Sequence, residues 1–374
     1  MQTLERQASP ERAPAGQSTH FYVPFLDGLR AVSILLIMGC HNLGPVSSWI
    51  AGQLSGWVSV DLFFIISGFL ITSILVREKT KRGNISLRNF YIRRWLRISP
   101  AYYAFLALMF VWTICRGGDQ YQSSFAVAGL YLTNIDLSSG WGLCLPGSGL
   151  IHTWTLSAEE QFYLMWPGLL KFSGNKALKI CITLIASSYI WRLYLLSTGA
   201  SWERLYYGLE GSMESIMLGV ASGLIWSTPH LQQKIRSLFS APGTATVMFA
   251  VLLISCHFLG HPSTAANLPL FWAAKFPIVI LLITGFMISM LVNPNSIPAK
   301  ILSFKPLVWI GQLSYSLYLW HIVVNFPATH SILVSIFHNK YLVELGKFAC
   351  CYGFALASFY LIEKPCLKLK DKYS

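Results

Sequence analysis

Charged residues are scarce in this sequence, and acidic residues are scarcer than basic ones. Only 11% of the 374 residues are charged, with 15 acidic side chains against 28 basic ones. Hydrophobic residues make up 54% of the chain. This composition argues against a soluble enzyme and favours an integral membrane protein with several spans.

Several patterns that would indicate a particular chemistry are also missing. The eight cysteines include no C-x-x-C pair and no Cys/His metal spacing, so we expect no bound metal. The sequence has neither a G-x-S-x-G elbow nor a recognisable triad order, which argues against a serine hydrolase. No apolar stretch precedes Phe25 as it would in a signal peptide, so the first span should also be the targeting signal.

Apolar stretches of spanning length recur along the chain and predict an all-α fold, a bundle of about ten transmembrane helices. We expect spans at residues 25–43, 57–76, 100–115, 152–170, 177–196, 213–227, 244–259, 276–292, 306–326 and 341–362. Residues 1–20 are polar and should form a disordered cytoplasmic tail. Residues 21–366 should form one membrane domain, and residues 367–374 a second cytoplasmic tail.

The net charge of +13 would suggest a nucleic-acid partner in a soluble protein, but the positive-inside rule explains it here. With the N-terminus in the cytosol, residues 77–99 form a cytoplasmic loop that holds eight Lys and Arg residues. External loops keep only Arg116, Arg204, Lys275 and Lys340. Arg192 and Lys347 lie within spans toward the outer side, against the rule. Both termini should therefore be cytoplasmic, and we expect no nucleic acid.

Residues 116–151 do not fit a simple series of spans. Their apolar stretch, 125–132, is too short to cross a membrane comfortably. We expect an external or re-entrant segment packed over the bundle, because a further span would invert the topology after it. Cys115 and Cys144 would then both lie on the outer side, where an oxidising environment would let them pair, and free thiols are the alternative.

Two ionisable residues, Arg30 and His41, lie eleven residues apart in the first expected span. Eleven helical steps rotate by ~1100° and advance by ~16 Å, so the two side chains share one helix face to within ~20°. Ionisable groups are costly in lipid, which indicates that this face lines a polar cavity. The charge bias places Arg30 toward the cytosol and His41 toward the outer half.

Three arginines follow the basic loop in the run RNFYIRRWLRISPAYY. Arg93, Arg94 and Arg97 have the spacing of one helix face. Guanidinium groups bind phosphate oxygens in a bidentate manner and keep their charge, so this cluster fits a polyphosphorylated donor such as coenzyme A. The alternative is a juxtamembrane helix held by anionic lipid headgroups.

Two adjacent carboxylates lie within a later span. Glu159 and Glu160 point about 100° apart on a helix, so at most one faces a given partner. We expect at least one of them to pair with an arginine or a protonated histidine. A carboxylate oriented on His41 would raise the basicity that a general base needs.

Other polar residues in the spans have a structural interpretation at least as good as a catalytic one. Asp61 could cap its helix or pair with an arginine. Ser67 and Gly68 predict a close helix contact rather than a nucleophile. His152 should be an interfacial residue. His321 lies in a cluster of aromatic residues, for which packing or an interface belt is the default and a direct role the alternative.

Six motifs occur in an order that resembles the acyltransferase-3 family of bacterial integral-membrane O-acyltransferases. They are FLDGLRA…H, VDLFFIISGFLIT, RRWLRISPAYY, HTWTLSAEEQFYLMWP, GQLSYSLYLWH and the closing IEKP at residues 362–365. Each motif alone is weak evidence. Six in order across nearly the whole chain, in a ten-span basic-inside protein, are strong evidence.

The resemblance implies transfer of an acyl group, most often acetyl, from cytosolic acyl-CoA to a hydroxyl group in a bacterial cytoplasmic membrane. Many members act on carbohydrates such as surface polysaccharide or lipopolysaccharide precursors, and others on peptidoglycan or small metabolites. The resemblance assigns roles to six residues: His41, Arg30 and Glu159 in catalysis, and Arg93, Arg94 and Arg97 in donor binding.

Two features depart from the family pattern. Some relatives carry a fused extracytoplasmic hydrolase-like domain, whereas this sequence ends at Ser374, so we expect transfer to finish in the membrane domain or on a separate protein. Relatives also often show an Arg-x-Asp pair near residue 212, where this chain has Ser212 and Glu214. The resemblance therefore does not settle whether residues 212 and 214 contact the acceptor.

These expectations combine into a mechanism. Acyl-CoA docks from the cytosol, His41 deprotonates the acceptor hydroxyl, and Arg30 stabilises developing negative charge or holds the donor. An acyl-histidine intermediate is the alternative mechanism. A transporter or flippase is the alternative function, against which stand the one-sided arginine cluster and the lack of convincing repetition between the two halves.

Overall fold

Long apolar stretches form long helices, and no strand occurs among the described residues. The computed structural model describes residues 22–42, 56–259, 269, 271–370 and 373. Its longer helices are α1 (Pro24–Asn42), α3 (Gly56–Arg82), α4 (Leu87–Cys115), α7 (Trp154–Ser173), α8 (Ala177–Ser197), α10 (Leu209–Trp226), α12 (Thr244–Leu259), α14 (Phe276–Val292) and α19 (Lys340–Ser358). The predicted all-α membrane fold is confirmed.

Shorter helices connect or extend these elements. They are α5 (Gln122–Gly129), α6 (Thr133–Ser139), α9 (Trp202–Tyr207), α11 (Pro229–Leu238), α15 (Ile297–Leu302), α16 (Lys305–Gln312), α17 (Ser314–Trp320), α18 (Pro327–Ile336) and α20 (Lys364–Lys370). The expected tail at residues 1–20 lies outside the described residues, and the expected tail at 367–374 begins within α20.

Five described segments are long and apolar enough to cross a membrane. They are Pro24–His41, Gly56–Arg82, Leu87–Cys115, Ile151–Ser197 and Lys340–Leu369. Lys305–Gln312 and Ser314–Asn325 would add a sixth span as one pair bent by 55°. Each of the ten expected spans falls on a helix or a broken helix pair, although α3 and α4 extend well beyond the spans expected at 57–76 and 100–115. The number ten stays a prediction.

The predicted loop at residues 77–99 is wrong, because most of it is helical. Helix α3 continues to Arg82, and α4 begins at Leu87. Lys, Arg and Glu are good helix formers whose long side chains reach water from a helix end, so both helices extend beyond their apolar parts. Ser86 caps α4 by accepting a hydrogen bond from the Asn89 amide at 3.4 Å.

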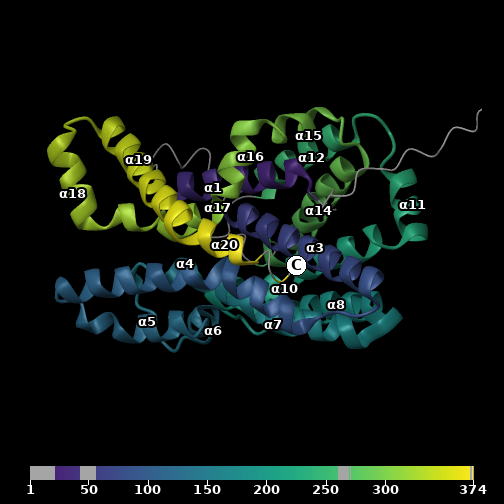
Figure 1. Ribbon diagram of the computed structural model, residues 1–374, viewed down its shortest axis with the longest axis horizontal. Helices are drawn as coiled ribbons and strands as arrows, with labels where there is room; N and C mark the ends of the chain where they lie inside the picture. The colour runs from purple at the N-terminus through teal and green to yellow at the C-terminus, as the bar shows by residue number, and fades with distance from the viewer. Residues whose placement is uncertain (1–21, 43–55, 260–268, 270, 371–372, 374) are drawn as a thin grey trace, which may run out of the picture.

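The segment after α4 folds into helices too short to span. Helix α5 has eight residues and α6 has seven, and Figure 1 shows both along one side of α4. The Tyr102 hydroxyl donates to the Ala128 carbonyl at 2.8 Å, which ties α4 to α5. The Asp136 carboxylate accepts from the amides of Leu143 and Cys144 at 3.0 and 2.9 Å, so it orders the loop that follows α6.

Cys115 and Cys144 do not form the disulfide that their expected location allowed. Both are free thiols, and Cys144 is buried whereas Cys115 is exposed. Burial raises the pKa of the Cys144 thiol to about 11. Because the thiolate is the reactive form, Cys144 is an inert packing residue.

Helices α3 and α10 approach each other closely through glycines. A Cβ atom added at Gly68 would overlap the α10 backbone at Ile216, and one at Gly219 would overlap the α3 backbone at Ile65. Gly223 makes a similar approach to Phe69. Small residues at such contacts are typical of membrane helix pairs. The close contact expected for Gly68 is confirmed.

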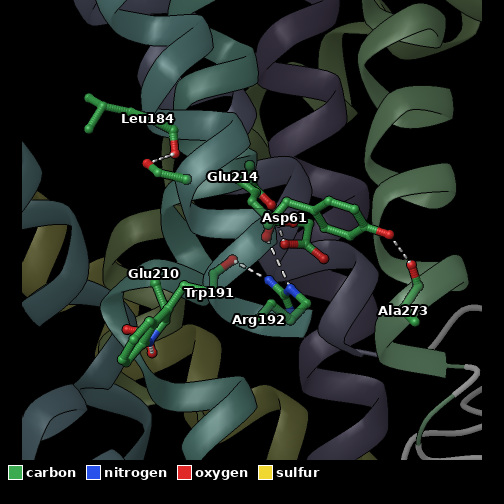
Figure 2. Close-up of polar contacts among 11 residues, drawn as sticks. Asp61, Leu184, Trp191, Arg192, Glu210, Glu214 and Ala273 are labelled. Atoms are coloured by element: carbon green, nitrogen blue, oxygen red, sulfur yellow. Dashed lines mark hydrogen bonds and ion pairs between the residues drawn. The ribbon is translucent and has the colours of Figure 1, made fainter. Parts of the chain in front are cut away.

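A buried cluster of charged residues joins α3, α8 and α10 (Figure 2). Arg192 Nε on α8 donates to Glu214 Oε1 on α10 at 3.0 Å, and Nη2 donates to the Gly211 carbonyl at 3.3 Å. Ser215 on α10 donates to the Asp61 carboxylate on α3 at 2.5 Å. Arg192 therefore breaks the positive-inside rule at little cost, because a carboxylate on the neighbouring helix neutralises it.

Gly219→Ala should destabilise the protein. The added methyl group must push α3 away from α10, and such overpacking costs about 1–3 kcal/mol. The control is Gly353→Ala, which places the same methyl group on α19 where no atom lies within 4 Å. It should be neutral or stabilising by up to about 1 kcal/mol, since alanine is the better helix former. Thermal unfolding of both variants in detergent measures the difference, and equal melting temperatures would contradict the predicted contact.

Arg192→Met should destabilise the protein by about 3–5 kcal/mol, because it leaves Glu214 buried without its charge partner. Arg204→Met is the matched control, since Arg204 pairs with Glu210 at a partly exposed position. That loss should be at most about 1 kcal/mol. The double variant Arg192→Met/Glu214→Leu should recover most of the stability. Thermal unfolding in the same detergent ranks the stability of the variants. If the double variant is as unstable as Arg192→Met, Arg192 does more than neutralise Glu214.

Candidate functional site

His41 contacts a second histidine from the far end of the chain. It lies in the last turn of α1, and its Nδ1 is 2.9 Å from Nε2 of His321. The two rings are stacked, with centroids 5.1 Å apart and planes 12° from parallel. His321 follows the last residue of α17 and is fully buried, whereas His41 is exposed. Hence α17 holds a ring that can orient His41.

The hydrogen bonds of this pair indicate where the protons lie. His321 Nδ1 is 2.7 Å from the Tyr318 carbonyl oxygen, which can only accept, so Nδ1 carries the hydrogen. In a neutral ring, His321 Nε2 is then an acceptor, and His41 Nδ1 must donate to it. This leaves the lone pair on His41 Nε2, the form that a general base requires.

His152 packs beside this pair, and the prediction that it is interfacial is wrong. The residue is 7% exposed. Its ring meets that of His321 edge to face, with centroids 5.3 Å apart. The Tyr318 hydroxyl donates to the His152 carbonyl at 2.6 Å, and this bond draws the turn before α7 into the bundle.

A cavity of about 530 Å³ opens beside the histidines. His41, His152 and Tyr318 line one part of it. Aromatic side chains make up much of the remaining wall: Trp57, Trp154, Trp202, Tyr206, Tyr207 and Trp272. A largely apolar cavity with a few polar groups is typical of small-molecule sites, and it suits a ligand that has both flat apolar faces and hydroxyl groups.

Arg30 lies in a second, smaller cavity of about 60 Å³. Glu159 lines the same cavity, and Val60 and Tyr318 line both cavities. The two cavities are therefore neighbours, with Arg30 beside one and His41 beside the other. This agrees with the shared helix face that the sequence predicts for Arg30 and His41.

Glu159 is not the residue that contacts His41 Nδ1, and this corrects the expected pairing. Ser67 donates to Glu159 Oε1 at 2.5 Å. Arg30 and Arg94 are close enough to the same carboxylate for electrostatic attraction. Glu159 thus faces arginines, one of the two alternatives considered for a carboxylate in this span, and His321 takes the place beside His41.

The three arginines of α4 have different surroundings. Arg93 donates to Glu78 at 2.9 Å and to the Tyr373 carbonyl at 2.7 Å, so it joins the ends of α3 and α4 to the C-terminal residues. Arg94 lies over the Tyr163 ring, 4.5 Å from its centroid.

Arg97 is close enough to Arg30 and Arg94 for mutual repulsion. Arg30, Arg94 and Arg97 therefore bring three positive charges to the side of the smaller cavity. Asp27, which pairs with Arg30 at 4.0 Å, and Glu159 offset part of that charge. An anion would relieve that repulsion.

No group of three or more His, Cys, Asp or Glu side chains in the described ranges has the arrangement to hold a metal ion. On the sequence alone, His321 had a direct role only as the alternative, His152 was placed at the interface and Tyr318 had no assigned role. An aromatic run ending in histidine is the only local signal for His321. Its meeting with His41, 280 residues away, is a property of the folded bundle.

Comparison with known proteins identifies the family. A family model described as an acyltransferase domain matches residues 23–364. The chain is 31% identical over 368 residues to peptidoglycan O-acetyltransferase OatA of Listeria monocytogenes, covering 93% of this chain and 56% of that protein. It is 30% identical over 368 residues to putative peptidoglycan O-acetyltransferase YrhL of Bacillus subtilis, with coverage of 92% and 55%.

A putative O-acetyltransferase of Staphylococcus aureus strain COL is also 30% identical, over 361 residues, with coverage of 92% and 57%. The chain therefore spans about half the length of the curated relatives it matches. No solved structure matches it. With the family model covering nearly all of the described bundle, this chain belongs to the acyltransferase-3 family of membrane proteins.

Proposed function

We propose that this protein is a membrane O-acyltransferase that moves an acetyl group from cytosolic acetyl-CoA to a hydroxyl of a carbohydrate. The observation that carries the proposal is the contact between His41 Nδ1 and His321 Nε2 at the wall of an aromatic cavity, because it leaves the lone pair on His41 Nε2. The family and the names of the relatives support acetyl transfer. We place the protein in a bacterial cytoplasmic membrane, with both termini in the cytosol.

The donor binds on the side of Arg30. Coenzyme A carries several phosphate charges, and Arg94 and Arg97 gather positive charge with Arg30 at this end of the site. Arg93 contributes less, because Glu78 already neutralises it. The pantetheine arm then passes the residues shared by the two cavities and brings the thioester to His41.

The acceptor binds in the larger cavity. The C–H faces of a sugar ring are apolar and stack on aromatic side chains, while its hydroxyls bond to polar atoms between them. The relatives' names point to peptidoglycan as one such acceptor, and surface polysaccharide or lipopolysaccharide precursors have the same chemistry.

The reaction is a transfer of one acyl group. His41 Nε2 takes the proton of the acceptor hydroxyl, and the hydroxyl oxygen bonds to the thioester carbonyl carbon. The carbon–sulfur bond then breaks, and the coenzyme A thiolate leaves with the proton from His41. An ester and free coenzyme A result, and His41 returns to its neutral form with Nδ1 still donating to His321.

His41→Ala should abolish acetyl transfer while the protein remains folded in the membrane. The measurement is incorporation of acetyl label from [¹⁴C]acetyl-CoA into alkali-labile esters in membranes that contain the protein. His330→Ala, at an exposed position of α18, is the control and should retain full activity. Ester formation at the normal rate in the His41 variant would contradict its role. Label taken up by vesicles without any ester would favour a transporter, and label retained on the protein through His41 would favour an acyl-histidine.

Arg94→Ala should raise the KM for acetyl-CoA about tenfold or more, because one charge-assisted contact to a phosphate is worth about 1.5–3 kcal/mol. The kcat should change much less. Arg88→Ala is the matched control, since Arg88 is exposed on the same helix. Initial rates over a range of acetyl-CoA concentrations give both constants. An unchanged KM would contradict donor binding and favour the alternative that Arg94 contacts anionic lipid headgroups.

A further inference from the structure

The larger cavity differs from the smaller one in charge as well as in size. None of the described residues that line the larger cavity is Asp, Glu, Lys or Arg, whereas Arg30 and Glu159 both line the smaller one. The polar side chains in the larger wall carry imidazole, phenol and thiol groups. The internal segments 43–55 and 260–268, outside the described residues, contain no Asp, Glu, Lys or Arg in their sequence either. A ligand in the larger cavity therefore meets no side chain with a fixed charge in the described wall.

The charged cluster behind the aromatic wall does not supply a positive charge in their place. Arg192 lies 5.6 Å from the ring of Trp272, but its Nε pairs with Glu214 at 3.0 Å. Asp61 is close enough to Tyr206 for electrostatic interaction, and Tyr206 lines the cavity. Figure 2 shows Arg192, Glu214 and Asp61 close together in the bundle. The cluster thus holds two carboxyl groups and one guanidinium group, and it offers no net positive charge to an anion in the cavity.

A wall of this kind discriminates against negative charge. A carboxylate that leaves water needs a cation or several hydrogen-bond donors in return, and an unpaired buried charge is strongly disfavoured. Aromatic faces do not replace the lost hydration of an anion, because the face of the ring is the negative end of its quadrupole. A neutral sugar avoids this cost, since its C–H faces stack on the rings and its hydroxyls bond to the few polar groups.

The two cavities together sort ligand groups by charge. Arg30 lines the smaller cavity, and Arg94 and Arg97 lie near enough to interact with it. An anionic group therefore has a favourable place on that side and none in the described wall of the larger cavity. The contrast also keeps donor phosphates out of the space that the acceptor needs, which is selection by exclusion as well as by attraction.

We propose that the larger cavity selects an acceptor whose bound sugar residue carries no negative charge. Sugars with a carboxylate, sulfate or phosphate group on that residue are excluded. This inference rests on the proposed function, because it takes the larger cavity as the acceptor site. Negative groups elsewhere in a longer acceptor stay outside the cavity, so the rule concerns the residue that receives the acetyl group.

Acetyl transfer by the purified full-length protein to two matched soluble sugars tests the rule. Both are methyl β-glucosaminides with the same hydroxyl groups. One carries an N-succinyl group, which ends in a carboxylate, and the other an N-succinamoyl group, which ends in a carboxamide of the same size. The kcat/KM for the carboxamide should exceed that for the carboxylate about 100-fold or more, because the carboxylate finds no charge partner. Mass spectrometry of the ester products gives both values.

A lysine placed in the wall should weaken the preference. Trp202 lines the larger cavity and is 42% exposed, so an ammonium group at this position can reach both the ligand and water. Trp202→Lys should reduce the preference about tenfold or more, mainly by lowering KM for the carboxylate sugar. Trp141→Lys is the matched control, since Trp141 is 57% exposed and lines neither cavity, and it should keep the wild-type preference.

The outcomes separate this proposal from the one on which it rests. If wild type acetylates both sugars equally well, or the carboxylate faster, charge selection is overturned and the proposed function stands. If neither sugar is acetylated although membrane glycans are, charge selection is also overturned, because other features then decide entry. If acetyl-CoA yields no ester on the sugars or on membrane glycans, both proposals fall. If Trp202→Lys does not fold, the wild-type ratio alone decides.

Discussion

Polar groups inside a membrane bundle need partners from the protein, because the hydrocarbon around it offers none. Most of the interior of this protein obeys that constraint, as Arg192 with Glu214 and Ser67 with Glu159 illustrate. Arg30 and His152 are less fully satisfied, although Asp27 pairs with Arg30 at 4.0 Å. Each lines a cavity, and each has a polar side-chain atom with no hydrogen-bond partner among the described residues. Other buried polar atoms without a hydrogen bond, for example those of Ser33 and Ser73, line neither cavity, so it is the position beside a cavity that distinguishes Arg30 and His152.

The arrangement separates the binding of charge from the chemistry of transfer. Positive charge gathers beside the smaller cavity, whereas the histidines stand beside the larger one. Tyr318 and Val60 form part of both walls, so they mark where a donor's acyl arm would pass. A long donor with phosphates at one end and a thioester at the other fits this division better than a compact solute does. For that reason the geometry favours group transfer over transport.

Features that depend on helix periodicity and on the length of apolar stretches could be predicted from the sequence. Features that depend on contacts between helices far apart in the sequence could not. The shared face of Arg30 and His41 follows from their spacing, and the arginine cluster follows from the basic segment before a span. The meeting of His41 with His321 joins α1 to α17, which no local pattern encodes. His152 was misplaced because it lies near a span end, where a histidine is usually interfacial. The helical state of residues 77–82 and 87–99 was missed because charge density was interpreted as a loop, although Lys and Arg favour helices.

The departure at residues 212 and 214 is easier to interpret once the helices are in place. The family pattern expected from the sequence has an arginine two residues before the acidic position, whereas here Glu214 pairs with Arg192 of α8. Arg192 also lies 5.6 Å from the ring of Trp272, which lines the larger cavity. Arg192 therefore packs against the aromatic wall, and neither Arg192 nor Glu214 lines the larger cavity. If the proposed acceptor binds there, it meets aromatic faces at this wall and no charge from residues 192 and 214.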